Sequence, residues 1–128
     1  MKILGIGVDI IDNKRIKNSI KRIQFRNRIY SSKELKHSNL IINKTNYFSK
    51  RFAAKEAFAK ALGIGFRKNL EFKDIEIIND NMGKPYFIKN KKISNIVKKT
   101  FKVKNFNCFL SISDEKDYST AFVIIQST

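Results

Sequence analysis

Residues 51–63 read RFAAKEAFAKALG, a run of alanines and phenylalanines that also carries four charged side chains. This composition predicts a helix over residues 47–62, which Gly63 would end. Within that helix Glu56 has small and apolar neighbours three and four residues away, so its carboxylate lies close to the packed face. Burying a carboxylate alone is very costly, and a cation should therefore meet it: Lys60, a metal ion, or both.

The start of the chain predicts a strand over residues 2–11, because β-branched side chains alternate there with small ones. Gly5 and Gly7 fall on the same face of this strand as Asp9. That face is bare just before the aspartate, so another element or a ligand could approach the backbone closely.

The remaining patterns predict an α+β fold, with helices packed on a largely antiparallel sheet, in a single domain over residues 1–128. Three further helices are expected. The first follows a cap at Asp12 or Asn13 and has an apolar stripe of Ile16, Ile20 and Ile23. The second starts with a capping box at Ser31, and the third lies around residues 93–101. Two hairpins are expected, from strands 72–78 and 84–88 and from strands 106–113 and 118–126. Residues 37–46 are polar and are expected to form a loop or a weak helix.

Size and charge narrow the function classes. The chain has 128 residues, one cysteine and a net charge of +16. A single cysteine allows no disulfide framework. The apolar run at the start of the chain is too short, and too interrupted by polar residues, for a signal or membrane segment. We therefore expect a cytosolic protein. The charge suggests nucleic acid, an anionic membrane surface or an acidic protein as partner. The many Ile, Lys and Asn residues also fit an AT-rich genome, which would explain part of the charge without any partner.

Asp9 and Glu56 both interrupt core-like patterns, and together they could hold a hard cation such as Mg2+. Acidic metal ligands beside Arg51, Lys55 and Lys60 would suit the transfer of a phosphoryl-type group, in which cations stabilise charge on phosphate oxygens. Two plainer interpretations stay open. Asp9 could bond local backbone amides at a strand end, and Glu56 could simply pair with Lys60 along the helix, which is worth about 0.2–0.5 kcal/mol.

Other kinds of catalytic site are poorly supported. His37 is the only histidine and lies in a polar stretch, where a surface role is expected. Cys108 alternates with apolar residues on a strand face and is expected to be a structural thiol. Zinc chemistry and Cys/His or Ser/His nucleophile systems are therefore disfavoured. The Gly5–Gly7 pair is too short and too early in its strand for a dinucleotide-binding fingerprint.

The motifs together resemble a known family. They are GIGVDII at 5–11 followed by Arg15-Ile16, RFAAKEAFAKALG at 51–63, DIEI at 74–77, NMGKP at 81–85, LSIS at 110–113 and YSTAFVII at 118–125. In this order and spacing the chain is similar to the bacterial holo-[acyl-carrier-protein] synthases, of the 4'-phosphopantetheinyl transferase family. The resemblance spans essentially the whole chain, and the stretch at 51–63 is its most specific part.

The resemblance implies an enzyme that moves the phosphopantetheine arm of coenzyme A onto a serine of acyl carrier protein, in support of fatty acid biosynthesis. It implies that Asp9 and Glu56 bind Mg2+, that Lys60 stabilises the pyrophosphate as it breaks, and that Glu56 removes the serine proton, directly or through a water. Arg51, Lys55 and, more weakly, Lys84 would contact the phosphates or nucleotide of coenzyme A. Members of this family are typically homotrimers.

The resemblance also implies a binding partner that would explain the positive net charge, because acyl carrier protein is strongly acidic. Four arginines along and after the first predicted helix would form a docking face for it: Arg15, Arg22, Arg26 and Arg28. The rival hypothesis is a small basic nucleic-acid-binding module, with aromatic side chains available for stacking. That hypothesis gives no reason for Asp9 and Glu56, which would repel phosphates unless a metal intervened.

One position departs from the family pattern. Many members have a histidine after the LSIS-like strand, where this chain has Asp114. An acid there puts in doubt any contribution of this position to coenzyme A binding, though not the metal site. Asp114 could instead cap the turn that follows.

Overall fold

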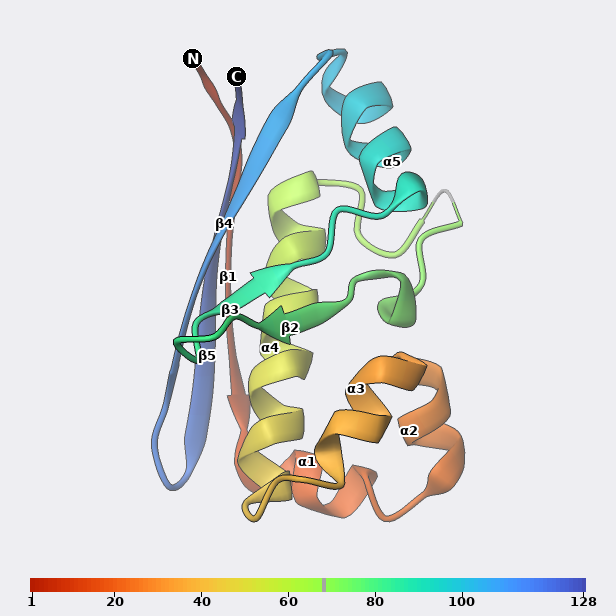
Figure 1. The fold of residues 1–128 in the computed structure, drawn as a ribbon, viewed down its shortest axis with the longest axis vertical. Helices are drawn as coiled ribbons and strands as arrows, with labels where there is room; N and C mark the ends of the chain where they lie inside the picture. The colour runs from red at the N-terminus through yellow and green to blue at the C-terminus, as the bar shows by residue number, and fades with distance from the viewer. Residues whose placement is uncertain (68) are drawn as a thin grey trace.

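The computed structural model describes residues 1–67 and 69–128. Its main sheet has three antiparallel strands in the order β1-β5-β4, formed by β1 (Ile3–Asp12), β5 (Tyr118–Ser127) and β4 (Phe106–Asp114) (Figure 1). β1 pairs with β5 along almost its whole length, so the two ends of the chain lie side by side at one end of the sheet (Figure 1). The predicted α+β fold and the second hairpin are confirmed.

Helix α4 (Lys44–Leu62) packs along one face of this sheet (Figure 1). Its side chains are buried on nearly every side, which marks it as the central helix of the domain. It begins earlier than predicted because the Asn43 side chain caps it by accepting a hydrogen bond from the backbone N–H of Asn46. It ends at Gly63, whose φ of 83° is the left-handed conformation expected of a C-cap glycine.

The bare face of the first strand lets α4 lie directly on the β1 backbone. A Cβ atom added to Gly5 would stand 1.8 Å from the carbonyl oxygen of Ala61. A Cβ atom added to Gly7 would stand at the same distance, 1.8 Å, from the carbonyl oxygen of Ala57. Neither position can hold a side chain without moving the helix away from the strand, so the predicted close approach is confirmed, and the element that approaches is α4.

Three short helices gather around the N-terminal half of α4 (Figure 1): α1 (Asn13–Ser19), α2 (Ile23–Ile29) and α3 (Ser32–Ser38). The predicted apolar stripe of three isoleucines was wrong for Ile23. The chain turns after α1, so Ile16 is buried while Ile23 is largely exposed. The capping box at Ser31 is confirmed by reciprocal hydrogen bonds with Glu34. Part of the stretch 37–46, expected as a loop or weak helix, belongs to α3 and α4.

The chain between α4 and β4 forms a small hairpin and one more helix: η1 (Phe72–Asp74), β2 (Ile77–Asn79), β3 (Pro85–Phe87) and α5 (Lys91–Phe101). A strand over the whole of 72–78 was wrong, because Asp74 caps a short helical turn by accepting from the Glu71 N–H. In the hairpin turn the Asp80 carboxylate accepts from the backbone N–H groups of Met82 and Lys84. Across the described residues, no helix combines the length and the hydropathy that crossing a membrane requires.

Candidate active site

Asp9 and Glu56 are brought together where α4 crosses β1. Asp9 lies on the face of β1 that packs against α4, and its side chain is mostly buried. Lys60, one helical turn beyond Glu56, places its ammonium 3.1 Å from Asp9 Oδ1 and 3.0 Å from the carbonyl oxygen of Val8. The predicted meeting of strand carboxylate, helix carboxylate and Lys60 is therefore present in the fold, and within the described residues Lys60 forms its ion pair with Asp9 and none with Glu56.

The electrostatics of this cluster favour an additional cation. Burial raises the pKa of the Glu56 carboxyl, the negative charge of Asp9 raises it further, and Lys60 and Arg15 lower it. Within the described residues the Glu56 carboxylate makes no hydrogen bond or ion pair, so its oxygens are free to accept. The Glu56 carboxylate and the second oxygen of the Asp9 carboxylate are the kind of donors that Mg2+ accepts, with water and phosphate oxygens completing its coordination.

Lys55 is not a phosphate contact, and that prediction was wrong. Its side chain is fully buried and donates three hydrogen bonds, to Glu34 Oε1 at 2.7 Å and to the carbonyl oxygens of Phe72 at 2.9 Å and Ile75 at 2.6 Å. An ammonium group has three protons, and all of them are used within the protein. Glu34, whose side chain also completes the capping box with Ser31, is the acid that neutralises it.

The predicted nucleotide contact Arg51 is buried on the side of α4 that faces the hairpin. Its guanidinium carbon lies 3.9 Å from the centre of the Tyr47 ring, and Nη2 donates to Asn79 Oδ1 at 3.3 Å. Burial lowers the pKa of Arg51, although the charge of Glu34 opposes this. Arg51 borders a cavity of about 170 Å3 between α4, the hairpin turn and β4, which we call the hairpin cavity. It is lined by Lys50, Arg51, Asn79, Gly83, Pro85, Ile112 and Asp114.

Two polar residues of α4 that contact Asp114, a residue lining the hairpin cavity, escaped sequence reasoning. Asn46 Nδ2 donates to Asp114 Oδ2 at 2.8 Å, and Lys50 Nζ lies 3.9 Å from Asp114 Oδ1. The acid at the unusual position is therefore held by α4, and its side chain does not simply cap the turn. Lys50 directly precedes the most specific motif, which was the available signal. Lys84 is exposed in the hairpin turn itself.

The four arginines predicted as a docking face are placed unequally. Arg15 is exposed on α1 close to the active-site cluster, since its charge lowers the Glu56 pKa and its guanidinium lies 5.9 Å from the Phe52 ring. Arg22 occupies the N-cap position of α2 without a side-chain capping hydrogen bond, and Arg26 and Arg28 lie in the last turn. Two residues apart on one helix, Arg26 and Arg28 point about 200° away from each other, so all four cannot share one face.

The remaining candidate residues behave as structural ones. His37 is exposed but lies on α3, with its ring centre 5.8 Å from that of Tyr47. Cys108 is half-buried on the inner face of β4, and burial raises the pKa of its thiol to about 12. Such a thiol is a poor nucleophile near neutral pH.

Comparison with known proteins identifies the family of this chain. The sequence model of the 4'-phosphopantetheinyl transferase superfamily matches residues 5–123. The chain is 60% identical over 126 residues to the holo-[acyl-carrier-protein] synthase of Pelagibacter ubique (strain HTCC1062), covering 98% of each chain. The fold matches the crystal structure of Neisseria meningitidis holo-[acyl-carrier-protein] synthase with a TM-score of 0.86 and 39% identity, over 98% of this chain and 99% of that one.

A second solved structure bears on the ligand. The holo-(acyl-carrier-protein) synthase of Bacillus anthracis, in complex with CoA (3',5'-ADP), matches with a TM-score of 0.83 and 34% identity over 100% of both chains. The family model and the identity to full-length relatives agree across nearly the whole sequence. This chain therefore belongs to the 4'-phosphopantetheinyl transferase superfamily.

Proposed function

We propose that this chain transfers the 4'-phosphopantetheine group of coenzyme A to a serine of apo-acyl carrier protein, in support of fatty acid biosynthesis. The observation that carries the proposal is the convergence of Asp9, Glu56 and Lys60 where α4 lies on the glycine face of β1, in a member of this superfamily. Relatives named holo-[acyl-carrier-protein] synthase, one of them solved with CoA (3',5'-ADP), supply the substrate class.

Asp9 and Glu56 would hold a Mg2+ ion, which supplies positive charge that neutralises the coenzyme A pyrophosphate. The unused oxygens of Glu56 support this assignment, and a cation would also offset the two effects that raise the Glu56 pKa, which are burial first and then the charge of Asp9. Lys60 would remain beside Asp9 and face the same pyrophosphate from the helix.

The reaction exchanges one phosphorus–oxygen bond for another. The carrier serine oxygen forms a bond to the phosphorus next to pantetheine, and the bond from that phosphorus to the bridging pyrophosphate oxygen breaks, releasing adenosine 3',5'-bisphosphate. Glu56 would take the serine proton, directly or through a water, and a raised pKa makes it a better base than an exposed glutamate. Lys60 would stabilise the negative charge that grows on the leaving oxygen.

The hairpin cavity is the proposed place for the nucleotide. Lys50 and Arg51 give it positive charge, and Gly83 and Pro85 line its other side without charge. Lys84, whose backbone is held by Asp80, is a further candidate because its exposed side chain is free to reach a phosphate. Asp114 would oppose phosphate binding, and its contacts with Asn46 and Lys50 would reduce that repulsion.

A homotrimer is also proposed, and the outer face of the main sheet supports self-association. Ile6, Val8 and Ile10 on β1 are 56%, 55% and 65% exposed, and Phe122 on β5 and Phe109 on β4 are 41% and 51% exposed. Strand pairing places Val8 beside Phe122 on that face. An apolar patch of this kind on a soluble enzyme typically marks an interface. Multi-angle light scattering would report the trimer mass.

Acyl carrier protein is the proposed macromolecular partner, and a cytosolic location the proposed setting. Arg15 is the best placed docking residue, since it is exposed and close to Glu56. We expect Arg15→Glu to slow carrier modification far more than it weakens coenzyme A binding, because steering between opposite charges acts on association rate. Equal losses for both substrates would contradict this docking position.

Incubation with coenzyme A, Mg2+ and apo-acyl carrier protein, followed by mass spectrometry of the carrier, tests the proposed reaction. We expect the mass gain of one phosphopantetheine group, nearly complete loss of it in Glu56→Gln, and an unchanged fold of that variant by circular dichroism. No mass gain, together with tight RNA binding, would replace this proposal by the nucleic-acid hypothesis. Full activity of Glu56→Gln at ordinary Mg2+ would refute a metal-ligand or base role for Glu56.

A further inference from the structure

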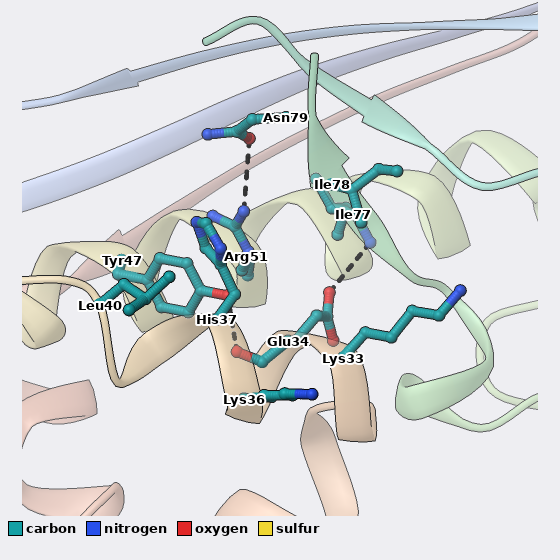
Figure 2. A pocket seen from close by; sticks show the side chains of 10 residues that line it. All are labelled: Lys33, Glu34, Lys36, His37, Leu40, Tyr47, Arg51, Ile77, Ile78 and Asn79. Carbon is teal, nitrogen blue, oxygen red and sulfur yellow. Dashed lines mark hydrogen bonds between the residues drawn. The ribbon is translucent and has the colours of Figure 1, made fainter. Parts of the chain in front are cut away.

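A second cavity that Arg51 borders lies between α3, α4 and β2 (Figure 2), and we call it the α3 cavity. Its volume of about 350 Å3 falls in the range of small-molecule sites, which is about 300–1,000 Å3. Apolar side chains form much of its wall, namely Tyr47, Leu40, Ile77 and Ile78. None of the chemistry proposed above uses this space.

Arg51 brings to the α3 cavity a positive charge that has no ion-pair partner among the described residues. Only 4% of the residue is exposed, and within the described part of the chain its guanidinium forms no ion pair. Its Nε has no hydrogen-bond partner in the described structure, although it is buried. Buried charges in folded proteins are normally paired, so Arg51 is available to an external anion from either of the two cavities that it borders.

The other charged residues around the α3 cavity also favour an anionic ligand. Lys33 and Lys36 line it from α3, where both are exposed. Glu34 also lines it, but its carboxylate is already neutralised by Lys55 and accepts the N–H of Ile77 (Figure 2). The cavity therefore presents three cations and no free acid.

We propose that the α3 cavity is a second ligand site, for a small amphipathic anion. A carboxylate or phosphate head would meet Arg51 and the α3 lysines, because a guanidinium offers two parallel N–H groups to such heads. The apolar body would lie against Tyr47, Leu40 and Ile78. Arg51 also borders the hairpin cavity, so an occupant here would compete for the guanidinium and raise the KM for coenzyme A; this last step rests on the proposed nucleotide site.

Titration of the metal-free, coenzyme-free protein with octanoate tests the site without any activity assay. We expect saturable NMR shifts at the backbone amides of Leu40, Ile77 and Ile78, and weaker or absent shifts with octan-1-ol, which lacks the charge. Octyl phosphate in place of octanoate distinguishes a phosphate head from a carboxylate head. Equal binding of octan-1-ol, or shifts spread over the outer sheet face around Val8, would overturn the proposal.

Charge reversal at the rim provides a matched pair of variants. Lys33→Glu/Lys36→Glu should weaken octanoate binding about tenfold. Lys91→Glu/Lys99→Glu makes the same change on exposed positions of α5 and should leave binding unchanged. Equal effects in both would mean general charge attraction and refute the site. Because binding is measured without coenzyme A or carrier, its loss would leave the proposed transfer reaction untouched, and a failed transfer assay would leave this result standing.

Discussion

Lys55→Met tests whether the lysine next to Glu56 in the sequence is structural. Methionine keeps much of the length of the side chain but removes its charge and its three donors. In the parent protein the ammonium lies 2.7 Å from Glu34 Oε1 and holds the carbonyl oxygens of Phe72 and Ile75. The variant would leave the Glu34 carboxylate buried with, among the described residues, only the backbone N–H groups of Ser31 and Ile77 as donors.

The expected cost is large because the pair is fully buried. Removing one partner of a buried ion pair destabilises a protein by about 3–5 kcal/mol, whereas an exposed pair contributes about 0–1 kcal/mol. A single domain has about 5–15 kcal/mol of stability in total, so Lys55→Met should remain folded only marginally. Removing both charges, in Lys55→Met/Glu34→Gln, should recover a substantial part of the loss, because no buried charge is then left unpaired.

Urea denaturation followed by circular dichroism, at equal protein concentration for every variant, measures these free energies of unfolding. Coenzyme A affinity of the folded fraction provides the second readout. A loss of less than about 1 kcal/mol for Lys55→Met would refute the buried-pair reasoning. A stable variant that had lost coenzyme A binding would restore Lys55 as a phosphate ligand.

Three further outcomes are expected. Gly7→Ala should lower the free energy of unfolding by about 3 kcal/mol or more, because its Cβ would stand 1.8 Å from the Ala57 oxygen; an unchanged melting temperature would contradict the close packing. In the metal-free protein, Asp9→Asn should lower the pKa of the Glu56 carboxyl, since the charge of Asp9 raises it; a 13C NMR titration showing a rise would reverse the electrostatic assignment. Cys108, with a pKa of about 12, should react with Ellman's reagent at pH 8 only on unfolding, and rapid labelling of the native protein would disprove its burial.

Much of the site could be predicted from local sequence. Asp9 and Glu56 stood out because each placed a charge in a core-like pattern, and the glycines before Asp9 indicated that something would lie against the strand. The structure confirms a close approach to that face, and it shows that the approaching element is α4, which also brings Lys60 to Asp9. Periodicity also predicted the β4–β5 hairpin, because the alternation of apolar and polar residues in both strands and the polar turn between them are local features of the sequence.

What the sequence by itself determined is which residues share a helix face or a strand face, and hence that Glu56 is an acid near the core. Only the tertiary structure decided what each face meets. Lys55 and Glu56 are adjacent in sequence but stand about 100° apart around α4. One therefore points to the buried Glu34, and the other points to Asp9. Helical periodicity determines the angle between two side chains. Long-range packing determines how exposed each of them is to solvent and which residue it contacts.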